Sequence, residues 1–104
     1  MRIFFAFLLF ALPLLGDEPD GKKVFEKGKC AVCHGADGGA DTPAGKSLGA
    51  RDLRSDEVQK MSDEELVAIV RDGGDKMPAF GKALSQKEIQ QVVAYIRQLA
   101  KAQR

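Results

Sequence analysis

The chain has 104 residues, enough for one small domain, and its 16 Lys and Arg residues nearly balance 15 Asp and Glu residues. This balance excludes the strong positive excess that non-specific binding to nucleic acid or to an acidic membrane requires, so we expect no nucleic-acid partner. Two cysteines, one histidine and no tryptophan also limit which metal sites and which cores the chain can build.

Residues 1–16, MRIFFAFLLFALPLLG, predict a secretory signal peptide. Arg2 gives a positive start, an apolar run extends to Leu12, and the small Gly16 precedes an acidic segment. The run is shorter than the about 20 residues of a membrane span, so we expect cleavage and not retention as an anchor. The domain is then 17–104, and the protein is expected to be periplasmic or otherwise exported. Without Arg2, fifteen basic residues face fifteen acidic ones and the domain is formally neutral.

The first predicted element of this domain is a short helix over GKKVFEK. It starts at Asp20 or Gly21 and reaches Lys27, because Gly28 ends it. Few large apolar side chains are available for a core of this size, so a bound apolar cofactor would fill a gap. The aromatic residues of the domain are Phe25, Phe80 and Tyr95.

The segment CAVCH follows, with both cysteines, Cys30 and Cys33, and the only histidine, His34. Residues three or four positions apart on a helical turn point to the same side, so all three side chains can face one flat object. Cys-x-x-Cys-His is the attachment signature of c-type haem. The two thiols form thioethers with the porphyrin vinyl groups, and the imidazole binds iron from one side.

Other uses of these residues fit less well. A zinc site usually needs four protein ligands, and the chain has only three Cys and His residues. A thioredoxin-like pair needs alternating strands and helices, which the sequence does not predict. A disulfide between Cys30 and Cys33 would close a tiny loop and stabilise little. We therefore expect one covalent haem c, which is attached outside the cytoplasm and so agrees with the predicted export.

After the motif, residues 34–54 are rich in Gly, Ala, Asp and Ser, and an irregular surface loop is expected. One or two helical turns can follow at 55–61. A second helix is predicted over 62–72, because Ser62 and Glu65 form a capping box and two glycines follow its last residue.

The sixth iron ligand decides the function, since iron bound by one histidine stays open to small molecules. No second histidine exists, so methionine is the expected ligand. Met77 lies in the glycine-flanked loop DGGDKMPAFG, and Pro78 favours an extended turn that can lean a thioether across the haem. Met61, just before a helix, suits core packing better. Histidine and methionine ligation together predict a raised reduction potential.

The final element is an amphipathic helix over 85–101, which begins with a capping box formed by Ser85 and Glu88. No segment alternates like a β-strand, so the fold class is expected to be all-α. The apolar residues of this last helix recur at helical spacing, namely Ile89, Val92, Val93, Ile96 and Leu99.

With these residues the sequence resembles small class I c-type cytochromes over its whole mature length. In that family a Cys-x-x-Cys-His motif lies near the N-terminus and a Met-Pro segment lies well after it. The resemblance implies a small cytochrome c fold with three to four helices around one covalently bound haem. It also implies thioethers at Cys30 and Cys33 and axial bonds to iron from His34 and Met77.

The resemblance extends to contacts around the haem. It implies that the N-terminal and C-terminal helices cross through Gly21, Phe25 and Tyr95. It also implies that a backbone carbonyl accepts the ring N–H of His34, with Pro43 as the candidate.

Two details of this comparison concern single residues. Phe25 stands five residues before Cys30, where the family often has four, so an extra residue is expected near Gly28. Three basic residues could neutralise haem propionates, although a solvated face is the stronger expectation for each of them. They are Lys46, Arg51 and Arg54.

These inferences predict an electron-transfer protein that carries one electron on a His/Met-ligated haem. We expect redox proteins as partners, no small-molecule substrate, no enzymatic activity and a monomer. One alternative is a haem enzyme or gas-binding module whose sixth ligand is labile. Another is an electron-transfer subunit of a larger respiratory complex.

Overall fold

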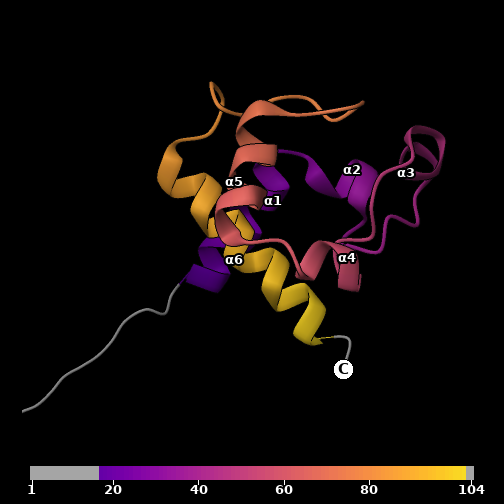
Figure 1. The fold of residues 1–104 in the computed structure, drawn as a ribbon, viewed down its shortest axis with the longest axis horizontal. Coiled ribbons are helices and arrows are strands. Elements are labelled where there is room, and N and C mark those ends of the chain that lie inside the picture. The colour runs from indigo at the N-terminus through magenta and orange to yellow at the C-terminus, as the bar shows by residue number, and fades with distance from the viewer. Residues whose placement is uncertain (1–16, 103–104) are drawn as a thin grey trace, which may run out of the picture.

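A computed structural model describes residues 17–102, so the predicted signal peptide at 1–16 lies outside the described residues. Within that range the chain forms helices and a single isolated β-bridge, with no strand (Figure 1). This confirms the all-α prediction. None of the helices in this range is both long and apolar enough to cross a membrane. The helices are α1 (Asp17–Lys27), α2 (Cys30–His34), α3 (Pro43–Leu48), α4 (Asp56–Gln59), α5 (Asp63–Asp72) and α6 (Gln86–Ala102).

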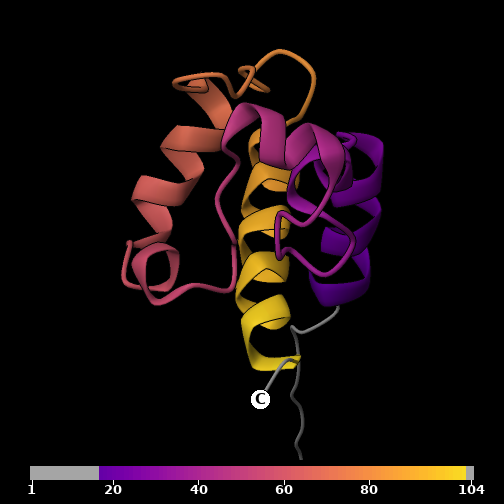
Figure 2. The ribbon, with the colours of Figure 1, turned by 90° about the vertical axis from the view of Figure 1, so that its right-hand side faces the viewer.

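The first and last helices pack directly against each other (Figures 1 and 2). At Gly21 a β-carbon would overlap the carbonyl of Gln91 and lie 2.7 Å from Cβ of Tyr95, so only glycine lets the helices approach this closely. The rings of Phe25 and Tyr95 are tilted by 60° with centroids 5.3 Å apart, a favourable aromatic geometry. The crossing expected from the family resemblance is therefore present.

The predicted helix starts agree with hydrogen bonds at two caps. In α5 the Ser62 hydroxyl accepts from the Glu65 backbone at 3.0 Å, and the Glu65 carboxylate accepts from the Ser62 backbone at 2.8 Å. Ser85 and Glu88 make the same pair of bonds ahead of α6. Helix α1 begins earlier than predicted, at Asp17, because acidic residues and a proline suit a first turn.

A single core lies between these helices. The apolar residues predicted on one face of α6 are all buried, with Val92 the most enclosed at 1% exposure. At the edge of this core, Arg97 donates to the carbonyls of Gln59 and Met61 and to the Asp63 carboxylate, so it fixes the turn between α4 and α5. The other large buried side chains are Val24, Phe25, Leu53, Val58, Leu66, Val70 and Leu84.

The prediction of an irregular loop over 34–54 is wrong for six residues, because they form α3. Thr42 caps this helix by accepting from the backbone of Gly45 at 2.9 Å, Pro43 occupies its first turn, and Gly49 ends it with φ of 70°. These cap residues match known preferences, but six residues are too few for a helical apolar pattern to emerge. Helix α4 falls inside the segment 55–61 where short helical turns were expected.

Candidate haem site

The three residues of the Cys-x-x-Cys-His motif share the five-residue helix α2, which follows α1 after two residues (Figure 1). The predicted helical turn is therefore present. Between the two helices Lys29 adopts the left-handed conformation, with φ of 58° and ψ of 30°. This left-handed residue interrupts the helical path between α1 and α2.

Both cysteines are half-buried, as is His34. Cys30 packs against the hydrophobic core, whereas Val32 on the opposite side of the turn is 56% exposed. Burial raises the pKa of the Cys30 thiol, and the nearby Cys33 raises this pKa further. Both thiols therefore lie on one helical turn and are partly shielded from solvent, as a pair of thiols that add to one flat group requires.

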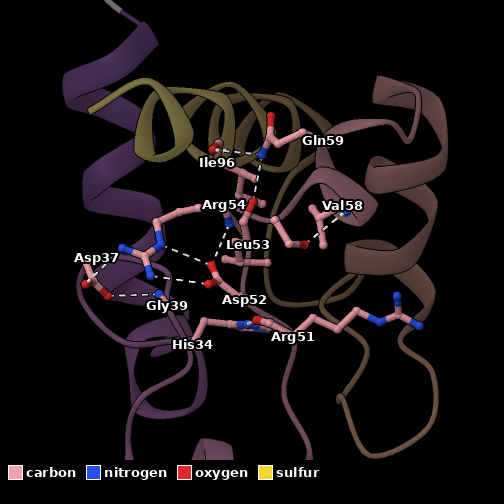
Figure 3. Close-up of polar contacts among 11 residues, drawn as sticks. His34, Asp37, Gly39, Arg51, Asp52, Leu53, Arg54, Val58, Gln59 and Ile96 are labelled. Carbon is pink, nitrogen blue, oxygen red and sulfur yellow. Dashed lines mark hydrogen bonds and ion pairs between the residues drawn. The ribbon is translucent and has the colours of Figure 1, made fainter. Parts of the chain in front are cut away.

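The imidazole of His34 is oriented by a backbone carbonyl. Its Nδ1 lies 2.9 Å from the carbonyl oxygen of Arg51, which can only accept, so Nδ1 carries the proton and Nε2 keeps its lone pair for a metal (Figure 3). The prediction that the Pro43 carbonyl accepts this hydrogen bond is therefore wrong. Pro43 opens α3, so its carbonyl points along that helix and not toward the imidazole.

Helix α3 holds α2 in place from one side. The Thr42 hydroxyl lies 2.7 Å from the carbonyl oxygen of Val32 and 3.2 Å from that of Cys33. A β-carbon at Gly45 would overlap the Cys33 carbonyl and lie 2.9 Å from that of Ala40. Sequence reasoning missed both Thr42 and Gly45. The Thr-Pro cap signal could have revealed Thr42, but nothing in the sequence marks Gly45.

Met77 is held in the loop between α5 and α6. Its backbone pairs with Gly74 through two hydrogen bonds of 2.8 and 3.1 Å. Gly73, with φ of 74°, lets this turn close, because a β-carbon there would lie 2.7 Å from the Met77 carbonyl oxygen. The Met77 side chain is half-buried and packs against the same core as Cys30. A β-carbon at Gly28 would lie 3.6 Å from the Phe80 ring, so this loop also borders the start of α2.

The remaining candidates lie elsewhere or have other partners. Met61 packs against the core, in agreement with its expected role. Lys46 pairs with Asp41 at 3.0 Å, and Arg51 pairs with Glu57 at 3.0 Å, both at exposed positions. Arg54 is less exposed and pairs with two carboxylates. A pocket between α5 and α6 has none of the four predicted site residues in its wall.

The donor set on α2 and in the Met77 loop fits a c-type haem. It offers two neighbouring thiols, an imidazole with one ring nitrogen available, and a thioether in a preformed loop. Within residues 17–102 no group of three or more His, Cys, Asp and Glu side chains is arranged to hold a metal ion. The chemistry of these donors and the all-α fold define a small class I c-type cytochrome.

Comparison with known proteins agrees with this class. Residues 16–96 match the family model described as cytochrome C oxidase, cbb3-type, subunit III. Cytochrome c6 of Rippkaea orientalis is 36% identical over 100 residues, which cover 96% of this chain and 86% of the relative. Cytochrome c6 of Thermosynechococcus vestitus is 36% identical over 83 residues, covering 80% of this chain and 70% of that relative.

A solved structure gives the same result. The KustC0563 c-type cytochrome superimposes with a TM-score of 0.70 at 34% identity, covering 77% of this chain and 96% of that one. The chain therefore belongs to the cytochrome c family. It is an electron-transfer protein with a covalent c-type haem and not an enzyme, as the sequence predicted.

Proposed function

We propose that residues 17–104 form an exported carrier of single electrons. Its haem is attached through Cys30 and Cys33, and its iron is bound by His34 and Met77. The observation that carries this proposal is helix α2, which places both thiols and the imidazole on one turn while Arg51 fixes the ring tautomer.

The haem supplies a one-electron couple, and the chain supplies the ligands and the apolar surroundings. The Nδ1–H of His34 is already hydrogen-bonded, so its ring needs no reorientation between oxidation states. Met77 is held by two backbone bonds to Gly74, so its thioether is delivered by a preformed turn. A soft thioether favours ferrous iron, so the reduction potential should be higher than with a second imidazole.

Location and partners follow from the sequence and from this chemistry. The signal-like segment 1–16 and the attachment of haem c outside the cytoplasm both support a periplasmic or otherwise exported protein. Redox proteins are the expected donors and acceptors, and the carrier acts as a monomer. The near-neutral charge of the mature domain supports recognition by local surface features and not by a general basic field.

Mass spectrometry of the native protein tests attachment and processing together. The expected mass is that of residues 17–104 plus one haem, and it should survive treatment with acidic organic solvent. Cys30→Ala and Cys33→Ala should each leave the haem held by a single thioether. A protein that loses all its haem in the solvent would contradict covalent attachment at these cysteines.

Spectroscopy of two matched variants tests the axial ligand. Met77→Leu preserves side-chain volume but removes the sulfur, so it should abolish the near-infrared methionine-to-iron band, lower the reduction potential and admit carbon monoxide. Met61→Leu makes the same change in the core and should leave all three properties unchanged. Ready binding of carbon monoxide by the reduced wild-type protein would instead favour a gas-binding or catalytic haem protein.

A further inference from the structure

The hydrogen bond of His34 depends on a carbonyl that no helix fixes. Arg51 lies between α3, which ends at Leu48, and α4, which begins at Asp56. The Arg51 side chain extends away from the imidazole (Figure 3), and it pairs with Glu57 at 3.0 Å. The position of the Arg51 carbonyl therefore depends on how the irregular segment 51–54 is anchored.

Arg54 anchors this segment to the loop that follows His34. Its Nε and Nη2 donate to the two carboxylate oxygens of Asp52 at 3.1 and 3.3 Å, and its Nη1 lies 3.4 Å from Asp37 (Figure 3). Asp37 is itself fixed, since it accepts from the backbone of Gly39 at 2.9 Å. The guanidinium thus joins the two chain segments that meet at His34.

The backbone of Gly39 packs closely against this guanidinium. A β-carbon at Gly39 would lie 2.5 Å from Nη2 of Arg54, so a larger residue there would displace the side chain. The Arg54 side chain is 22% exposed, compared with 52% for Arg71, which pairs with Asp72. The backbone of Leu53 donates to the carbonyl of Gly38 at 2.7 Å, which closes the same junction.

We propose that Arg54 is a positioning residue for His34. It holds the Arg51 carbonyl at hydrogen-bonding distance from Nδ1 and so sets the strength of that hydrogen bond. This inference rests on the proposed ligation of iron by His34. A stronger bond at Nδ1 makes the other ring nitrogen a better electron donor, which stabilises ferric iron and lowers the reduction potential.

The test compares two Arg→Lys variants of the holoprotein. Arg54→Lys keeps the charge but replaces the planar fork with a single ammonium group, which cannot bind both oxygens of Asp52 and reach Asp37 in the same way. Arg71→Lys is the matched control, because Arg71 makes a similar two-pronged contact with Asp72 at the end of α5. The measured quantities are the solvent exchange rate of the His34 Nδ1 proton by NMR and the reduction potential.

Arg54→Lys should accelerate exchange of the Nδ1 proton by about three- to tenfold, as expected for one weakened hydrogen bond. It should also raise the reduction potential, whereas Arg71→Lys should leave both quantities at wild-type values. Wild-type exchange and potential in Arg54→Lys would overturn the proposal. Equal changes in the two variants would also overturn it, because the effect would then belong to any surface arginine.

Two further measurements separate the possible failures. If Arg54→Lys does not retain haem, Asp52→Asn weakens the same contact and should accelerate Nδ1 exchange; an unchanged rate would overturn the positioning role. The wild-type NMR spectrum tests the ligation itself. If the ring protons of His34 lack the chemical shifts of an iron ligand, the proposed site is rejected. If they show those shifts but the Nδ1 exchange rate is unaltered in the variants, only the role of Arg54 is rejected.

Discussion

Replacing Gly21 with alanine should weaken the contact between α1 and α6. The new β-carbon would overlap the Gln91 carbonyl and lie 2.7 Å from Cβ of Tyr95, atoms that cannot rotate away. Ordinary carbon contacts are about 3.5–4.0 Å, so the helices must separate by about 1 Å. Overpacking of this kind costs about 1–3 kcal/mol, and two close contacts with atoms that cannot move place this site in the upper part of that range, at about 2–3 kcal/mol. Alanine recovers about 1 kcal/mol of helix propensity, which leaves a net loss of about 1–2 kcal/mol.

Thermal and urea unfolding of the holoprotein measure this loss directly. For a domain of this size the melting temperature should fall by about 5–15 °C. Gly74→Ala is the matched control, because a β-carbon there would meet nothing within 4 Å, and it should change stability by less than about 0.5 kcal/mol. A Gly21→Ala protein as stable as the wild type would refute the reasoning, because the helices would then have room that the structure does not show.

Three other changes test separate parts of the fold. Gly45→Ala would force α3 away from the Cys33 carbonyl and should cost about 2 kcal/mol or more in urea unfolding; wild-type stability would contradict the tight contact. The hydrogen bond from Arg54 lowers the pKa of Asp52, so its contribution to stability is complete above a pH of about 4 and is lost as the pH falls through the lower folded-state pKa. Asp52→Asn should therefore flatten the stability profile of acid titrations monitored by circular dichroism, and parallel profiles would exclude this contribution. Lys29→Gly should raise the free energy of unfolding by up to about 1 kcal/mol, and with it the melting temperature, because glycine tolerates the left-handed conformation. A lower melting temperature would show that this turn is not strained.

The chemistry of the site could be predicted because it depends on side-chain types at fixed spacing. Two cysteines and a histidine within five positions specify their own geometry once they form one helical turn. The caps of α5 and α6 were predictable for the same reason, since Ser62 and Ser85 each stand three residues before a glutamate.

The supporting contacts could not be predicted because they involve the backbone. Any residue has a carbonyl, so nothing distinguished Arg51 from Pro43 as the acceptor for His34. Gly45 is one of 11 glycines, and its role depends on how closely α3 approaches Cys33, which only the folded chain determines. Local sequence thus specifies the reacting groups, while long-range packing decides how they are held.

The packing of α6 has a consequence for biogenesis. Tyr95 of α6 packs against α1, and Arg97 of α6 binds the turn after α4. The N-terminal and middle parts of the domain therefore cannot complete their packing before the last helix is made. Such distant pairings form late, after the chain has left the ribosome nearly in full. If the chain is exported as we propose, this late folding would leave it unfolded while it crosses the membrane and until it meets its haem.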